Sequence, residues 1–329
     1  MRLLFFIQSH RDPDQLSRLA RILRQGCAQS VVLISHNEQA EALSPSLFDG
    51  DPHIHIIRGR GGRGNFALLD GYLAGLRWLR ESKIDYDWIT NLSGQDYPAS
   101  SLAGFSCELS QSSHDGFLHH FDVLKGDPQE MSPMIWPAGH GHERYYYQYT
   151  KLKDDLNLVE RAALRVPRVV LDRVTDKLRI NTAYGLMIGR PAERVPFTAD
   201  FRCYAGSYWH TIRRRCADHL LEFFESNPDI SEYFRHVLLP DECFPHTILV
   251  NHSVFRFVND NRRYVNMCGA RRGHPKILTE DDIPKFAGQR YVFARKIEWV
   301  SGPELFDRLD RYALGDDRHV ATGSSKPAA

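Results

Sequence analysis

No stretch of this 329-residue chain is both long and apolar. The first apolar run, Leu3 to Ile7, is too short for the core of a signal peptide or for a membrane span. No later window approaches the roughly 20 apolar residues that a transmembrane helix requires. We therefore expect a soluble protein without a transmembrane segment.

The chain also has few cysteines and little net charge. Its six cysteines form no C-x-x-C pair, which argues against a structural zinc site and favours free thiols in a reducing compartment. A formal net charge of +1 gives no reason to expect a nucleic-acid partner. Hydrophobic and charged residues make up 42% and 25%, as in globular proteins. We expect a cytoplasmic location, and association with the inner face of the cell membrane stays open.

Apolar runs and helical periodicity alternate over the first 95 residues. The expected strands are residues 3–9, 31–35, 54–57 and 86–92, and the expected helices are residues 12–26 and 65–83. Asp12 and Asn65 are the expected N-caps of these helices, Pro13 suits a first helical position, and Gly26 a C-cap. Strands separated by helices predict a parallel, doubly wound sheet of α/β class.

Polar residues follow the expected strands. Ser9-His10, His36-Asn37, the loop 58–64 and "SGQDYP" all fall at their carboxyl ends. Parallel sheets bind ligands at this edge. We therefore expect a ligand site there.

The pattern is mixed after Ser113. Expected strands are residues 116–121, 208–212, 255–259 and 291–297, expected helices are 154–178 and 218–226, and residues 134–152 are expected to be irregular. We predict one domain over residues 1–315, with a nucleotide-binding half (1–112) and an acceptor-binding, catalytic half of mixed α+β structure (113–315). The small polar tail 316–329 is expected to be disordered.

Three motifs have both a functional and a plain interpretation. "GRGGRGN" (59–65) joins a strand to a helix but lacks the P-loop ending, so a nucleotide-contacting loop and a surface turn both stay open. Asp96 is the only acid in its motif, whereas a divalent cation that bridges two phosphates needs several oxygen ligands. The alternative is that Asp96 caps the following turn. His140 and His142 form an incomplete ligand set, which favours an ordinary loop over a metal site.

Cations and an aromatic residue mark two further stretches. Arg295 and Lys296 lie side by side in "RYVFARKIEW", where fixed cations can stabilise a diphosphate leaving group. A surface strand is the alternative, but its neighbours are apolar. Trp209 in "YAGSYWHTIRR" is either a core residue or a platform on which a sugar stacks.

Two adjacent carboxylates, Asp241 and Glu242, occur in "LLPDECFPHTILVN". A helix N-terminus favours their ionised form, and helical neighbours point about 100° apart, so one acid can cap the helix while the other faces a cleft. Taken alone, this stretch is best interpreted as an N-cap followed by a second acid.

Five motifs, in order, resemble the core-2/I-branching enzyme family, glycosyltransferase family 14. They are "FFIQSHRDPDQLSRLARIL", "DWITNLSGQDYP", "AGSYWHTI", "LLPDECFPHTILVN" and "RYVFARKIEW", and they span residues 3–299. This family includes branching N-acetylglucosaminyltransferases and peptide O-xylosyltransferases. The fourth motif and "FARK" look closer to the xylosyltransferase branch.

The resemblance implies a GT-A-like, Rossmann-type fold with a mostly parallel sheet flanked by helices. It also implies inverting transfer from a UDP-sugar without a metal ion or other cofactor. By similarity, Glu242 matches the catalytic base, Arg295 and Lys296 match the diphosphate contacts, and Asn37 falls where xylosyltransferases have an Asp near the nucleoside. His10, Arg63 and Asp96 complete the expected donor site.

The sequence departs from the family at three places. Pro245 replaces an aromatic residue, "SHNE" replaces "HVD", and Arg63 stands where a Trp often occurs. The family's eukaryotic members are anchored Golgi proteins rich in disulfides, which this chain does not resemble in either respect. We therefore expect a bacterial enzyme of surface polysaccharide synthesis.

The predicted reaction moves xylose or N-acetylglucosamine from a UDP-sugar to a hydroxyl of a saccharide or glycolipid acceptor. Ser207, Trp209 and Asp241 are expected to line the sugar or acceptor pocket. Two alternatives stay open: an inverting glycoside hydrolase, whose carboxylates must lie about 6.5–9.5 Å apart, and a non-catalytic carbohydrate- or UDP-binding relative.

Overall fold

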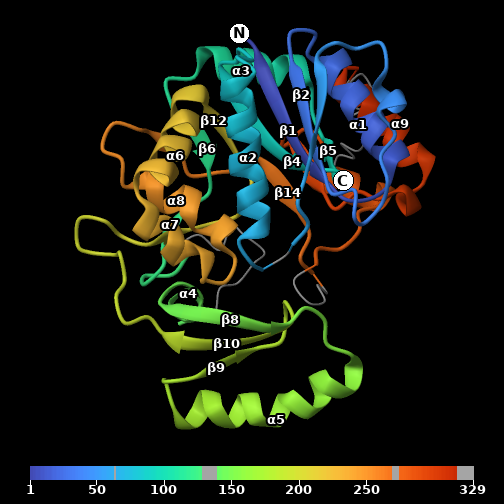
Figure 1. The fold of residues 1–329 in the computed structure, drawn as a ribbon. Helices are drawn as coiled ribbons and strands as arrows, with labels where there is room; N and C mark the ends of the chain where they lie inside the picture. Colours follow the sequence, from blue (N-terminus) through green and yellow to red (C-terminus); the bar gives the residue numbers. More distant parts are fainter. Residues whose placement is uncertain (63, 128–138, 269–273, 317–329) are drawn as a thin grey trace, which may run out of the picture. The chain divides into compact units, whose positions relative to one another are not determined.

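The computed structural model (Figure 1) describes residues 1–62, 64–127, 139–268 and 274–316. The chain divides into two compact units. Unit 1 consists of Met1–Gly59, Asp85–Ser113 and the chain from Asn261 onward, and unit 2 consists of Arg60–Ile84 and His114–Asp260. Each unit is therefore assembled from separate stretches of the sequence.

The core of unit 1 is a set of four parallel strands. They are β1 (Leu3–Ser9), β2 (Val31–His36), β3 (Ile54–Arg58) and β4 (Trp88–Ser93), and they pair in the order β4-β1-β2-β3. Every side chain from Leu3 to Ile7 is fully buried, as expected for a strand covered on both faces. The predicted strands of this region are confirmed.

The strand order creates a switch point between β1 and β4. The chain proceeds from β1 to β2 and β3 on one side and then returns to pair β4 on the other side of β1. Doubly wound sheets bind ligands at the carboxyl ends of the two strands at such a point. In unit 1 these ends are Ser9 and Ser93.

A smaller sheet and several helices complete unit 1. The sheet contains β14 (Arg263–Val265), β15 (Phe293–Arg295) and β5 (Asp96–Pro98), and the helices are α1 (Pro13–Gly26), α3 (Leu102–Gln111), α9 (Pro303–Ala313), and the 3₁₀ turns η1 (Pro45–Phe48), η3 (Glu280–Lys285) and η4 (Trp299–Ser301). Helices α1 and α9 pack together (Figure 1), joined by an ion pair of 2.7 Å between Arg18 and Asp310.

The ends of α1 follow the prediction in part. Asp12 is the N-cap residue and Pro13 the first helical residue, as predicted, but Asp12 is left-handed and its side chain makes no cap hydrogen bond. Gly26 is the last helical residue, and Cys27 is the C-cap. Asp12 Oδ2 lies instead 3.3 Å from Arg11 Nε. The Asp12 carboxylate thus pairs with Arg11 and does not cap the helix.

Unit 2 contains a second group of strands covered by helices. Strand β6 (Gly116–Leu118) runs antiparallel to β12 (His210–Arg213) and parallel to β13 (Phe257–Val258), and the helices are α2 (Ala67–Glu81), α6 (Arg214–Ser226), α7 (Pro228–Arg235) and α8 (Phe244–Val250). The N-cap of α2 is Phe66, and Asn65 Oδ1 accepts from Ala67 N at 3.1 Å. A buried hydrogen bond of 2.9 Å between Tyr72 and His210 ties α2 to β12.

The middle of the chain forms an antiparallel sheet in unit 2. Strands β8 (Tyr147–Lys153), β10 (Leu186–Pro191) and β9 (Arg179–Asn181) pair in that order, and α4 (His140–Tyr145) and α5 (Leu158–Val174) flank the first and last of them. The prediction of irregular structure for residues 139–152 is wrong. Strand β8 forms because β10, distant in sequence, supplies its partner groups. Residues 134–138 lie outside the described part.

The predicted class is confirmed: the protein is α/β, with four parallel strands at the core of unit 1, further mixed strand pairing, and flanking helices. All six cysteines are free thiols. Among the described residues, none of the helices combines the length and apolar character needed to cross a bilayer. The predicted disordered tail falls, from residue 317 on, outside the described residues.

Candidate active site

The carboxyl ends of β1 and β2 are tied together in unit 1. Ser9 Oγ lies 2.8 Å from His36 Nδ1, and Asn37 N donates to the carbonyl of Ser9 at 2.9 Å. His10 and Asn37, two of the residues predicted to contact the donor, thus follow directly from linked strand ends. Burial, followed by the nearby charges of Arg11 and Lys296, lowers the pKa of His10.

Asp96 is fully buried at the first position of β5. Its Oδ2 accepts hydrogen bonds from Ser93 Oγ at 2.8 Å and from Ser93 N at 2.5 Å, and its Oδ1 lies 3.5 Å from Arg295 Nε. The turn-capping role that the sequence left open is therefore present. The same carboxylate also fixes Arg295, which faces it across the antiparallel β5–β15 pair.

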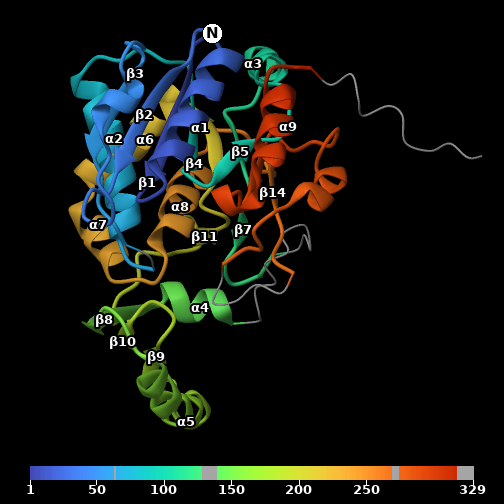
Figure 2. The ribbon, with the colours of Figure 1, turned by 90° about the vertical axis from the view of Figure 1, so that its right-hand side faces the viewer.

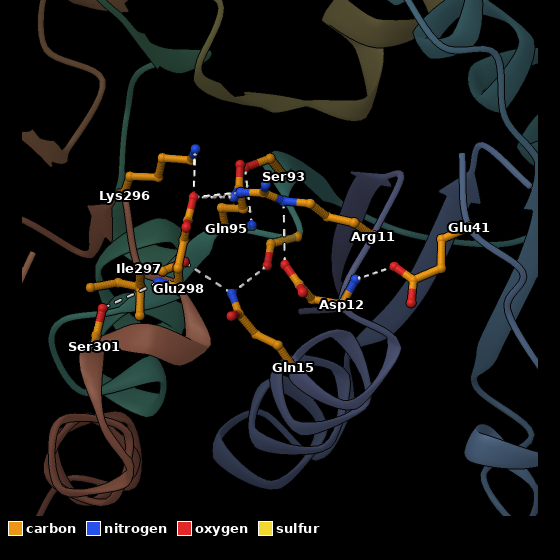
Figure 3. A network of polar contacts seen from close by, with 11 residues as sticks. Arg11, Asp12, Gln15, Glu41, Ser93, Gln95, Lys296, Ile297, Glu298 and Ser301 are labelled. Atoms are coloured by element: carbon orange, nitrogen blue, oxygen red, sulfur yellow. Dashed lines mark hydrogen bonds and ion pairs between the residues drawn. The ribbon is translucent and has the colours of Figure 1, made fainter. Parts of the chain in front are cut away.

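Lys296 belongs to a second, linked network at the switch point (Figure 3). Its Nζ lies 2.5 Å from Glu298 Oε1, and the same oxygen accepts from Arg11 and, at 2.7 Å, from Gln95 Nε2. Gln15 Nε2 bridges the carbonyls of Gly94 and Ile297 at 2.8 and 3.0 Å. The segment that carries both cations is thus anchored to the ends of β1 and β4.

The charges of this network are almost balanced. Burial would raise the pKa of Glu298, but the hydrogen bond from Lys296 and the charges of Lys296 and Arg11 hold that pKa below its usual value. Arg295 and Lys296 are each 14% exposed. A diphosphate that reaches them would therefore meet two preorganised cations whose present partners are carboxylates.

In unit 2, Asp241 and Glu242 lie on a 3₁₀ turn, η2 (Pro240–Glu242), which precedes α8. Leu239 enters the turn in a left-handed conformation (φ 50°), and Glu242 N donates to its carbonyl at 3.0 Å. The expectation that both acids occupy a helix N-terminus is therefore wrong. Helix α8 begins only at Phe244, with Pro245 in its first turn.

The two carboxylates have different surroundings. Asp241 is 3% exposed. Glu242 Oε2 lies 2.8 Å from Arg144 Nη1 of α4, and each side chain of this pair is 16% exposed. Burial would lower the pKa of Arg144, and Glu242 raises it, so the guanidinium stays charged beside the acid. Glu242 is thus a partly exposed carboxylate with a fixed orientation.

The loop between β11 (Tyr204–Ala205) and β12 is held against this turn. Gly206 N donates to the carbonyl of Glu242 at 2.9 Å, and Ser207 and Trp209 follow it, both half-buried. The Trp209 ring lies beside Tyr208, with centroids 5.2 Å apart. The structure therefore brings Asp241, Glu242, Ser207 and Trp209 together in one unit.

Other sequence predictions have plainer outcomes. Arg63 lies outside the described residues, but the carbonyl of Gly64 accepts from Leu239 N at 3.2 Å, so this loop contacts the acid turn. His142 stacks on Tyr146, with ring centroids 4.9 Å apart. No group of three His, Cys, Asp or Glu side chains that could hold a metal ion occurs within the described residues.

The sequence did not identify five residues of these networks: Arg11, Gln15, Gln95, Arg144 and Glu298. Arg144 lies 98 positions from Glu242, so no local spacing could indicate the pair. Glu298 is different. It follows Lys296 by two residues, and side chains two apart in an extended segment share a face, which was a usable signal.

Comparison with known proteins supports the resemblance to glycosyltransferase family 14. No family model matches the chain. A β-glucuronosyltransferase, GlcAT14A of Arabidopsis thaliana, is 25% identical over 84% of the chain, and the xylosyltransferase oxt of Drosophila pseudoobscura pseudoobscura is 23% identical over 91%. Both relatives are named as glycosyltransferases. The chain spans 55% of the first and 32% of the second.

Solved structures give a weaker comparison. Mouse xyloside xylosyltransferase 1 aligns over 92% of this chain and 99% of its own, with 11% identity and a TM-score of 0.38. A score of this size does not establish a common fold. The α/β assignment therefore rests on the strand pairing described above.

Proposed function

We propose that this protein is an inverting, metal-independent glycosyltransferase that moves a sugar from UDP to a hydroxyl of a saccharide acceptor. The observation that carries the proposal is the orientation of Glu242 by Arg144, beside the loop that bears Ser207 and Trp209. The names of the similar proteins from Arabidopsis and Drosophila support the same reaction class. The transferred sugar is xylose, N-acetylglucosamine or, in view of the Arabidopsis relatives, glucuronic acid.

In the proposed mechanism Glu242 accepts the proton of the acceptor hydroxyl. The acceptor oxygen forms its bond to the anomeric carbon on the face opposite UDP, and the bond from that carbon to the diphosphate oxygen breaks. Positioned general bases contribute about 10²–10⁴-fold to such steps. The departing UDP carries negative charge that Arg295 and Lys296 stabilise.

The donor site is assigned to the switch point of unit 1. His10 and Asn37 would contact the nucleoside side, and Asp96 would hold Arg295 in place. Arg63 lies outside the described residues, and its role as a donor contact is inferred from the sequence alone. Ser207, Trp209 and Asp241 would contact sugar or acceptor. We assign the reaction to bacterial surface polysaccharide synthesis, near the inner face of the membrane, with a saccharide or glycolipid acceptor.

The catalytic role is tested by Glu242→Gln. Transfer from a panel of UDP-xylose, UDP-N-acetylglucosamine and UDP-glucuronic acid should fall about 10²–10⁴-fold, while UDP still raises the melting temperature. Glu222→Gln, an exposed acid of the same unit, is the matched control. Near-wild-type transfer by Glu242→Gln, or activity that a chelator abolishes and a divalent metal restores, would refute the proposal.

The donor site is tested separately with Arg295→Met and Lys296→Met. A ligand stabilises the folded state in proportion to its binding, so the thermal shift by UDP should shrink in both variants. Each lost charge-assisted hydrogen bond is worth about 1.5–3 kcal/mol, or roughly 10- to 150-fold in UDP affinity. Arg311→Met on the exposed side of α9 should bind UDP normally. Unchanged UDP binding in both test variants would place the diphosphate elsewhere.

A further inference from the structure

Helix α5 presents an apolar side that the described part of the protein does not cover. It begins with a complete capping box, in which Asn157 and Glu160 exchange hydrogen bonds of 2.9 Å, and it packs beside β9 (Figure 2). None of its residues is buried. The helix is therefore well defined at its start while contributing almost nothing to the core of unit 2.

Valines form a continuous stripe along the exposed side. Val159, Val166, Val170 and Val174 are 77%, 68%, 51% and 77% exposed. Their spacing of seven, four and four residues keeps them on one face of an α-helix. We call these four residues the valine stripe.

The orientation of the helix is fixed by its other side. Leu164 and Leu171 are half-buried, and Arg161 donates to the carbonyls of Leu156 and Thr182 at 3.0 and 2.5 Å. These contacts turn the valine stripe outward. The exposure of the stripe thus follows from the contacts of α5 with its own unit.

Basic residues outnumber acids on this helix. Four arginines (Arg161, Arg165, Arg168 and Arg173) accompany Glu160 and Asp172 within Leu158–Val174. Glu160 already pairs with Lys153 at 2.5 Å. Arg165 and Arg173 are exposed and adjoin the stripe on the helix surface. An apolar stripe edged by arginines matches a surface that is apolar within and anionic at its boundary.

The area of the valine stripe indicates which kind of partner can cover it. A helix of 17 residues is about 26 Å long and about 10 Å wide, so one face offers on the order of 250 Å². A stable protein interface requires about 800 Å² per partner. A second copy of the chain could not dimerise stably through this face alone. A lipid surface can accept such a helix, because an amphipathic helix lies along the membrane plane.

We propose that α5 docks unit 2 on an anionic lipid bilayer, with the valine stripe at the boundary between headgroups and acyl chains. Arg165 and Arg173 bind the headgroup phosphates. The helix lies on the membrane rather than across it, in keeping with the lack of a spanning helix among the described residues. This proposal is independent of the transfer reaction.

The test is sedimentation of the full chain with phosphatidylcholine vesicles, with and without phosphatidylglycerol. The wild-type chain should bind the anionic vesicles, and binding should weaken as salt screens the arginines. Val166→Glu/Val170→Glu should lower vesicle affinity at least tenfold. Val195→Glu/Val254→Glu, which changes two exposed valines elsewhere in unit 2, should leave it within twofold.

The electrostatic part has its own pair of variants. Arg165→Glu/Arg173→Glu should abolish the preference for phosphatidylglycerol, and Arg190→Glu/Arg194→Glu, with the same change in net charge, should retain most of it. Equal binding by the wild-type chain and both α5 variants would overturn the proposal. So would a failure of the wild-type chain to bind vesicles, or a dimer in light scattering that Val166→Glu/Val170→Glu dissociates.

Discussion

At the scale of single residues, the ion pair of Glu242 and Arg144 is the feature on which the proposed chemistry depends. Both side chains are only 16% exposed, so each charge relies on the other for much of its stabilisation. Removing one member of such a pair leaves an uncompensated charge in a poorly solvated place, which costs more than the net value of the pair.

We expect Arg144→Met to lower the free energy of unfolding by about 2 kcal/mol, because the Glu242 carboxylate loses its partner. The double variant Arg144→Met/Glu242→Gln should recover at least about 1 kcal/mol of this loss, because glutamine carries no charge. Urea unfolding followed by circular dichroism measures both. Lys151→Met, which breaks a surface pair with the 87% exposed Asp154, should cost less than about 0.5 kcal/mol. Simple additivity of the two single changes would show that Arg144 does not hold Glu242.

In each of these ion pairs, the sequence indicates a role for only one of the two partners. Arg295 and Lys296 were identified because two cations among apolar neighbours are unusual, but their partners Asp96 and Glu298 were assigned other roles or overlooked. Glu242 was found through its motif. Arg144 was not, because a contact between residues so far apart in sequence depends on the tertiary fold.

At the scale of elements, the close approach of the β11–β12 loop to the 3₁₀ turn sets the position of the acids. Gly206 donates to the carbonyl of Glu242, and a Cβ at this position would lie 1.9 Å from the carbonyl of His119. Only glycine therefore allows the loop to pass so close to His119 while it is hydrogen-bonded to the turn. The position of the backbone at Glu242 therefore depends on the absence of a side chain at Gly206.

Gly206→Ala should destabilise the protein by about 3 kcal/mol, because backbone must move to admit the methyl group. Gly104→Ala is the control: its Cβ would meet nothing closer than 3.5 Å, and in the first turn of α3 the change should be neutral or stabilise by up to about 0.5 kcal/mol. Thermal unfolding of both variants decides the matter. An equal melting temperature for Gly206→Ala and the wild type would disprove the close approach.

The sequence predicted some elements well and others poorly for physical reasons. The predicted bounds of β1 match the observed ones at both ends, because an uninterrupted apolar run indicates a strand covered on both faces. Strand β8 was missed because its last residues, Lys151 to Lys153, are exposed and show no alternation. The turn at Pro240–Glu242 depends on the left-handed conformation of Leu239, which no sequence pattern indicates.

At the scale of the whole molecule, burial of histidines sets the response to acid. Burial is the main cause that lowers the pKa of His119, His120, His140 and His246, for His140 to about 4. The folded state therefore binds fewer protons than the unfolded state below the ordinary histidine pKa of about 6.5. Stability must rise with pH through this window and fall as the pH is lowered.

We accordingly expect the melting temperature to fall between pH 7 and pH 5, before most carboxylates titrate. Each fully buried histidine contributes a loss of up to about 1.4 kcal/mol per pH unit within its window. His246→Gln should flatten the slope of stability against pH, whatever its effect at pH 7. A melting temperature that is constant or higher at pH 5 would contradict the assignment.

The chain passes between the two units four times, and this has a consequence for how the protein is made. Unit 1 begins with the first residue and is completed only by the stretch from Asn261 onward, which supplies β14, β15 and α9. During synthesis on the ribosome, Phe5 therefore cannot contact Phe293, its edge-on ring partner, until the chain has emerged beyond residue 293. Unit 2 is complete earlier, at Asp260, so the second unit in sequence order is the first that can fold.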